Sequence, residues 1–237
     1  MQPRDRLIFP LDVPNKTEAE RLISRLKDDV GLFKVGLELF VSEGPGILKA
    51  IRELTPAGIF LDLKLHDIPE TVRRAFLAAS AYGPRFVTVH CDAGEGFLRE
   101  VAENNPGHTQ ILGVTVLTSL SSQNLARTGF QEEYVRDLLK LVLLRAGIAK
   151  EAGCQGIVCS GQEVAAVKRE FPDLIAVTPG IRPAWSIVGQ DDQKRVVTAA
   201  GAVKSGADYI VVGRPIRDAK DPADAARRVA EEIASAL

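Results

Sequence analysis

Short apolar runs alternate along the chain with stretches of helical periodicity, and this alternation restricts the fold more than any other feature. Eight runs rich in β-branched or apolar residues are candidate strands. They lie at residues 7–9, 32–35, 59–64, 86–89, 111–116, 156–159, 175–178 and 209–212. Apolar character without strict alternation is typical of parallel strands that are buried on both faces. The pattern therefore predicts a parallel sheet covered by helices.

Helical stripes fill the intervals between these runs. Thr17 to Glu20 has the form of a capping box, and Leu22, Ile23 and Leu26 supply the apolar stripe of the first helix. Similar stripes occur at Ile47/Ile51/Leu54, Val72/Phe76/Ala79, Leu138/Leu139/Val142/Leu143, Val164/Val167/Phe171 and Ala225/Val229/Ile233. Eight such units without a break in composition predict an α/β protein in which residues 1–237 form a single (β/α)₈ TIM barrel domain.

The charge balance excludes some classes of partner. Thirty Lys and Arg residues face 31 Asp and Glu residues, for a net charge of −1. Because the positive and negative charges are nearly equal in number, the protein has no general attraction for nucleic acid or for an anionic membrane surface. No apolar stretch reaches the ~18 residues that a membrane helix needs. Three cysteines without CxxC spacing suggest buried thiols in a reducing compartment, and we expect a cytoplasmic protein.

Charged residues lie where the candidate strands end. Asp12 follows the first strand, Lys34 lies in the second, and Asp62 and Lys64 share one side of the third because side chains alternate along a strand. A buried ion pair of this kind is a poor stabiliser, since both ions lose their hydration. The array therefore favours a catalytic role at the C-terminal barrel mouth, where barrel enzymes carry their chemistry.

A second cluster follows the last two strands. Arg182 comes after the seventh strand, and Gly213 and Arg214 come after the eighth. Loops at these positions often bind phosphate, and guanidinium groups suit a phosphate dianion. The stretch between the arginines, residues 184–193, is long and of mixed polarity, and is either a lid that closes on a phosphate or a passive insertion.

A metal site is weakly indicated. His66, Asp67, His90 and Asp92 fall near strand ends, but no HExxH or clustered histidine spacing occurs. Neither a P-loop nor a dinucleotide-binding GxGxxG is present. The residues therefore argue against a metal site and show no motif for these nucleotide ligands.

Several motifs together resemble the orotidine 5′-phosphate decarboxylases of bacteria. The matching segments are residues 11–12 (LD), 33–36 (FKVG), 62–71 (DLKLHDIPET), 114–119 (VTVLTS), 177–183 (VTPGIRP) and 211–215 (VVGRP). They occur in the family's order over nearly the whole chain. The third segment alone also resembles related enzymes such as hexulose-phosphate synthase, whereas the combination is more specific.

The resemblance implies decarboxylation of orotidine 5′-monophosphate to UMP, without metal or organic cofactor, in de novo pyrimidine synthesis. It implies four catalytic residues, of which Lys64 donates the proton to C6 and Asp62 lies beside the departing carboxylate. Lys34 holds Asp62 and, with Asp12, contacts the ribose. Asp67 completes the catalytic set.

The same resemblance implies a homodimer. Asp67, Ile68 and Thr71 are expected to reach into the partner's site. The substrate's pyrimidine is expected at Thr118, and its phosphate at Arg182, Gln193, Gly213 and Arg214. Gln190 remains an alternative to Gln193, because both glutamines lie in the lid segment.

Two other functions stay open. A Mg²⁺-dependent sugar-phosphate enzyme of the same barrel group would share Asp62, Lys64 and Asp67 but arrange its carboxylates around the metal. A phosphoribosyl-ligand sensor would bind nucleotide without forming product. A sensor has little use for a buried Asp62 beside Lys64, which argues against the second alternative.

Overall fold

Eight parallel strands close into a barrel in the order β1 to β8 in this computed structural model, which describes residues 1–186 and 196–237. The strands are β1 (Leu7–Pro10), β2 (Leu32–Val35), β3 (Gly58–Leu65), β4 (Phe86–His90), β5 (Gln110–Val114), β6 (Gly156–Val158), β7 (Ile175–Thr178) and β8 (Tyr209–Val211). Pairing of β1 with β8 closes the ring through Leu7 with Ile210 and Ile8 with Val211. The predicted (β/α)₈ TIM barrel is confirmed.

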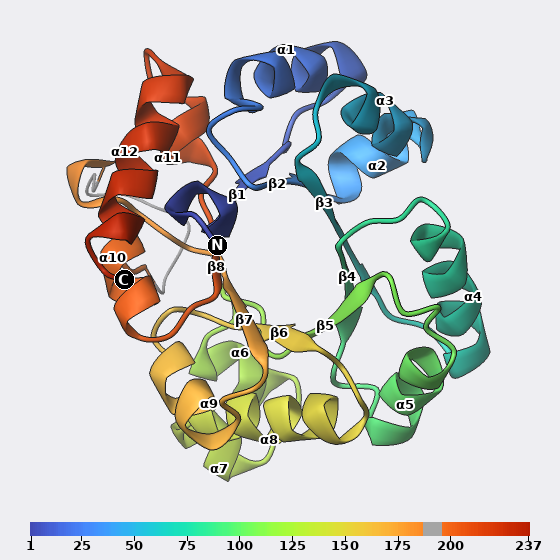
Figure 1. Cartoon of the computed structure of the whole chain (residues 1–237). Helices are drawn as coiled ribbons and strands as arrows, with labels where there is room; N and C mark the ends of the chain where they lie inside the picture. Colours follow the sequence, from blue (N-terminus) through green and yellow to red (C-terminus); the bar gives the residue numbers. More distant parts are fainter. Residues whose placement is uncertain (187–195) are drawn as a thin grey trace.

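Helices surround the ring of strands, as Figure 1 shows. They are α1 (Lys16–Leu26), α2 (Leu37–Glu43), α3 (Gly46–Leu54), α4 (Pro69–Ser80), α5 (Glu95–Glu103), α6 (Ser122–Arg127), α7 (Glu132–Arg136), α8 (Leu138–Glu151), α9 (Val164–Glu170), α10 (Ala199–Lys204), α11 (Arg214–Arg217) and α12 (Pro222–Ala234). Two 3₁₀ segments are described as well, η1 (Pro3–Arg6) before β1 and η2 (Ala184–Ser186) after β7.

Two apolar layers hold the barrel together. The outer layer lies between strands and helices and contains the buried stripes predicted for α1, α3, α4 and α12. The inner layer fills the barrel itself and is made of Ile8, Leu32, Phe60, Phe86, Leu112, Val177 and Tyr209, with Val158, Ile175 and Val211 packed against them. Because alternate residues of a strand face the same side, the residues two places beyond this inner layer also face inward, toward the C-terminal mouth.

The structure corrects the predicted start of the first helix. Asn15, not Thr17, is the N-cap of α1, and its side-chain oxygen accepts a hydrogen bond from the backbone N–H of Glu18 at 3.0 Å. Asparagine caps helices at least as well as threonine, so the earlier residue takes this position. Thr17 lies in the first turn of the helix instead.

Strand ends also differ by one or two residues from their predicted positions. The fifth strand stops at Val114 rather than residue 116, and the Oγ1 of Thr115 donates a hydrogen bond to the carbonyl of Val158 at 2.9 Å. The α8 stripe is shifted as well, since Leu141, Val142 and Ala146 are buried there while Leu138 is only partly buried.

Two other features bear on the sequence-based expectations. No helix in the described part of the chain is long and apolar enough to cross a membrane. No disulfide joins Cys91, Cys154 and Cys159, and all three are buried, as their apolar surroundings in the sequence predicted for the last two.

Gly156 offers a test of how closely the strands pack. A Cβ atom at this position would lie 2.4 Å from the carbonyl oxygen of Ile175 and 2.9 Å from a methyl carbon of Leu112. Gly156→Ala should therefore destabilise the protein by about 1–3 kcal/mol, measured as a lower urea midpoint. Gly46→Ala is the matched control, because nothing lies within 4 Å of the added atom. A Gly156→Ala midpoint equal to that of Gly46→Ala would contradict the close packing of β6 on β7.

Candidate functional site

Four charged side chains meet at the C-terminal mouth of the barrel. The ammonium of Lys34 lies 3.0 Å from Oδ1 of Asp12 and 3.6 Å from Oδ2 of Asp62, and the ammonium of Lys64 lies 2.8 Å from that same Oδ2. The strands β1, β2 and β3 are neighbours, so consecutive strands carry these groups to one place. The array alternates in sign from Asp12 to Lys64.

Asp62 is the buried centre of the array. Its exposed fraction is 8%, and its Oδ1 accepts a hydrogen bond from the hydroxyl of Thr88 at 3.0 Å. Burial by itself raises the pKa of Asp62, but the charges of Lys34 and Lys64 and the hydrogen bonds from Lys64 and Thr88 outweigh it. The pKa of this carboxyl therefore lies below its ordinary value, and the group is ionised at neutral pH.

The backbone at Lys64 has an unusual conformation. Its φ is +50°, the left-handed region, and Lys64 is the only residue other than glycine with positive φ in the described part of the chain. The register of β3 on β4 shifts between Leu61 and Leu65. An L-residue adopts this conformation at a cost of about 1–2 kcal/mol, which the surrounding contacts have to offset.

Thr88 holds this irregular segment in place. Its Oγ1 accepts a hydrogen bond from the backbone N–H of Lys64 at 2.9 Å while its hydroxyl donates to Asp62. One buried hydroxyl thus fixes both the carboxylate and the backbone of the lysine beside it. Sequence reasoning missed Thr88, because threonine is common in strands and nothing in its spacing distinguishes it.

A further polar cluster lies beside the end of β4. Asp92 is 3.3 Å from Nε2 of His66, 3.7 Å from Nδ1 of His90 and 3.7 Å from the guanidinium of Arg145. Arg145 is buried and donates a hydrogen bond to the carbonyl of Thr115 at 2.6 Å. These contacts tie the segment after β3 to the end of β5. A lone arginine in the apolar sequence of α8 was the signal that could have revealed Arg145.

The weakly indicated metal site involved residues of this same region, namely His66, Asp67, His90 and Asp92. In residues 1–186 and 196–237, no group of three or more His, Cys, Asp or Glu side chains is arranged to hold a metal ion.

The segment after β3 is open to solvent. Asp67, Ile68 and Thr71 are exposed, and Ile68 has an exposed fraction of 67%. Oδ1 of Asp67 accepts a hydrogen bond from the backbone N–H of Ile68 at 2.6 Å. The three residues lie at the start of α4, apart from the buried centre at Asp62.

The predicted phosphate-binding residues follow neighbouring strands. Arg182 comes after β7 and Gly213 and Arg214 after β8, and these two strands pair through Val177 with Tyr209 and Thr178 with Ile210. Gly213 packs so closely on β1 that a Cβ atom there would lie 3.0 Å from Cγ of Pro10. Thr118, four residues after the end of β5, is partly buried. Gln190 and Gln193, with most of the predicted lid, lie outside the described residues.

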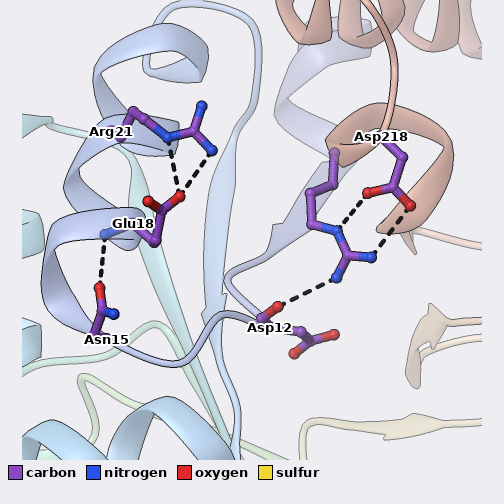
Figure 2. A network of polar contacts seen from close by, with 6 residues as sticks. Asp12, Asn15, Glu18, Arg21 and Asp218 are labelled. Atoms are coloured by element: carbon purple, nitrogen blue, oxygen red, sulfur yellow. Dashed lines mark hydrogen bonds and ion pairs between the residues drawn. The ribbon is translucent and has the colours of Figure 1, made fainter.

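Arg217 connects Asp12 to the segment that follows β8. Its guanidinium pairs with the carboxylate of Asp218 at 2.7 Å and donates to the backbone carbonyl of Asp12 at 3.3 Å, as Figure 2 shows beside the capped start of α1. Arg217 ends the short helix α11, whose first residue is Arg214. The charged array and the Gly213–Arg214 turn are thus joined through one side chain.

Comparisons with known proteins agree over nearly the full chain. A family model described as "Orotidine 5'-phosphate decarboxylase / HUMPS family" matches residues 5–229. The chain is 49% identical to a curated orotidine 5′-phosphate decarboxylase of Desulfosudis oleivorans, with 99% of this chain and 95% of the relative covered. It is 48% identical to the protein of the same name from Methylococcus capsulatus, with 97% and 92% covered.

A solved structure is similar in both fold and sequence. The crystal structure of orotidine 5′-phosphate decarboxylase from Lactobacillus acidophilus superposes with a TM-score of 0.80 and 34% identity, covering 96% of this chain and 98% of that one.

Thr88 can be tested through the titration of Asp62. Thr88→Val removes the hydrogen bond to the ionised carboxylate, so the pKa of Asp62 should rise, measured by NMR titration of ¹³C-labelled aspartate. The variant should also lose about 1–3 kcal/mol of unfolding free energy at neutral pH. Because Asp62 titrates below its ordinary pKa in the folded state, this loss should shrink as pH falls through that lowered value.

Thr88→Ser is the matched control, since it keeps the hydroxyl. It should leave the titration of Asp62 close to that of the parent protein. An unchanged Asp62 titration in Thr88→Val would contradict the role given to this hydrogen bond.

Proposed function

Because the chain belongs to the orotidine 5′-phosphate decarboxylase / HUMPS family, we propose that it is a carboxy-lyase that converts orotidine 5′-monophosphate to UMP in pyrimidine biosynthesis. The observation that carries the proposal is the contact of Lys64 with a buried, ionised Asp62 inside the Asp12–Lys34–Asp62–Lys64 array. The full-length likeness to curated relatives of this name supports the decarboxylase over other members of the family.

Lys64 supplies the charge and the proton that the reaction needs. When CO₂ leaves C6, the electron pair of the broken C–C bond stays on C6, and no neighbouring carbonyl delocalises it. An ammonium placed at that carbon stabilises the developing charge and then transfers a proton to it, which gives UMP. The resulting amine regains its proton from water. This assignment gives a cofactor-free mechanism, with the lysine in the place that a Lewis acid takes in metal enzymes.

Asp62 and Lys34 prepare the site for this step. An ionised Asp62 beside the substrate carboxylate raises the energy of the bound substrate relative to the transition state, in which that negative charge moves away toward C6. Lys34 balances the charge of Asp62 at 3.6 Å and contacts Asp12 at 3.0 Å. In this scheme, Asp12 and Lys34 hold the ribose hydroxyls.

The remaining residues bind the ends of the substrate. Arg182, Gly213, Arg214 and Gln193 or Gln190 hold the phosphate, and Thr118 faces the pyrimidine. The attachment of Arg182 and Arg214 to neighbouring strands supports a shared phosphate site. Phosphate contacts far from C6 contribute binding energy that serves the transition state.

The proposed active unit is a homodimer of single-domain chains. Ile68 is exposed between Asp67 and Thr71, so this segment is accessible to a partner chain. In the dimer, Asp67, Ile68 and Thr71 complete the partner's site. We place the enzyme in the cytoplasm, which three cysteines without a disulfide support.

Lys64→Ala should abolish turnover. The loss of general-acid and electrostatic stabilisation corresponds to a fall in kcat of about 10²–10⁴-fold or more. The measurement is the change in ultraviolet absorbance of orotidine 5′-monophosphate, with UMP identified as product, in the presence and absence of EDTA. Lys49→Ala is the control, because Lys49 is an exposed lysine on α3. Retained kcat in Lys64→Ala would refute its role, and activity lost to EDTA would favour the Mg²⁺-dependent sugar-phosphate enzymes.

Mixed dimers test the shared site. Lys64→Ala and Asp67→Ala chains are each expected to be inactive alone. In a mixed dimer, one site contains an intact Lys64 from one chain and an intact Asp67 from the other. Random mixing should therefore restore about a quarter of the parent activity, since half of the dimers are mixed and each has one intact site. Mixtures that stay inactive after verified subunit exchange would contradict the contribution of Asp67 to the partner.

A further inference from the structure

A hollow lies at the N-terminal end of the barrel, opposite the charged array and below the inner apolar layer. Its volume is about 620 Å³, and it is lined by the first residues of β3 and β5, Gly58 and Gln110, together with Arg52, Arg85 and His108. Hollows of this size accommodate small molecules. The proposed reaction uses none of these residues.

Arg85 is fixed in place at the bottom of the barrel. Its guanidinium lies over the rings of Phe86 and Tyr209, at 5.4 and 5.2 Å from the ring centres, and donates to the hydroxyl of Tyr209. Its backbone is held between neighbouring strands, with its N–H donating to the carbonyl of Ile59 and its carbonyl accepting from the N–H of Gln110, both at 2.8 Å. Arg85 therefore presents a pre-oriented cation to the hollow.

Two more basic side chains are anchored around the same loop. Arg52 donates to the carbonyl of Gly83 at 2.7 Å, which places its guanidinium beside the chain two residues before Arg85. Nε2 of His108 lies 2.8 Å from the carbonyl of Ser80, just upstream. Fixing these side chains in advance lowers the entropy that a bound ligand has to remove.

The charge of this hollow has one sign. Its lining contains no Asp or Glu, and neither Arg52 nor Arg85 has a carboxylate within salt-bridge distance in residues 1–186 and 196–237. Each guanidinium has five N–H donors, of which the contacts above use only one, so donors remain for a ligand. Since the whole chain carries a net charge of −1, this concentration of positive charge is local.

A neighbouring hollow of about 550 Å³ provides the contrast. It shares Arg85 and Gly58 but is lined by both signs of charge, with Arg4 and Lys27 facing Asp5 and Asp28. Arg4 is already engaged, at 4.0 Å from Asp5 and 2.7 Å from the carbonyl of Asp28. Carboxylates therefore offset part of the positive charge of this neighbouring hollow, whereas the lining of the hollow between Arg52, Arg85 and His108 contains none.

We propose that the hollow between Arg52, Arg85 and His108 is a binding site for a small molecule that carries phosphate groups. Arginine forks bind phosphate oxygens in pairs, and two anchored guanidiniums without carboxylate partners favour a ligand with more than one negative charge. The site is separated from the charged array by the inner apolar layer, so it is distinct from the proposed substrate site.

Pyrophosphate is the probe, and His108 reports on this site alone. The protein has three histidines, and the other two, His66 and His90, lie at the opposite mouth. The ring resonances of His108 should shift in a saturable way as pyrophosphate is added at constant ionic strength. Arg52→Gln should weaken the apparent affinity about tenfold, as expected for the loss of a charge-assisted contact. Arg52→Gln combined with Arg85→Gln should remove saturation.

Lys27→Gln is the matched control, because it removes one positive charge from the neighbouring hollow. This variant should leave the shift of the His108 resonances with added pyrophosphate unchanged. Arg52 is exposed, so its replacement keeps the test valid even where Arg85→Gln disturbs the packing beneath it. A His108 signal that does not shift, shifts linearly without saturation, or responds equally in Arg52→Gln and Lys27→Gln would overturn the proposal.

Discussion

The buried carboxylate of Asp62 is the constraint around which this molecule is organised. A carboxylate inside a barrel loses most of its hydration, and an unpaired one would be very costly to bury. Lys34, Lys64 and the hydroxyl of Thr88 compensate for that loss from three neighbouring strands. The pairing of β2, β3 and β4 brings these groups to within 3.6 Å of one carboxylate, so the charged site depends on the assembled sheet.

The inner apolar layer supports this array from below. Phe60 and Phe86 meet edge to face at 5.9 Å, and Phe86 meets Tyr209 in the same way at 5.2 Å. On β3 and β4, the residues two places further along are Asp62 and Thr88, so the aromatic floor and the polar site belong to the same inward-facing rows. Such a floor limits the movement of the groups above it, which suits a site whose chemistry depends on position.

The barrel and the positions of its charged residues could be predicted from the sequence because both follow from periodicity. Strand runs and helical stripes are local patterns, and a charge at a strand end falls at the barrel mouth whatever the details of packing. The cap of α1 at Asn15 could not be separated from Thr17 in this way, because both residue types cap helices. The roles of Thr88 and of the positive φ at Lys64 were also beyond sequence reasoning, because they arise from contacts between two strands. The dimer and the residue roles remain predictions, since they concern bound substrate and a second chain.

The tightly packed interior of the barrel also determines how molecules reach the proposed active site. Aromatic and aliphatic side chains fill the space between the two mouths, and Arg85 covers the lower one. Substrate, CO₂, product and the proton that restores Lys64 must therefore all use the upper mouth. In the proposed mechanism, Lys64 regains its proton through the same opening by which UMP leaves.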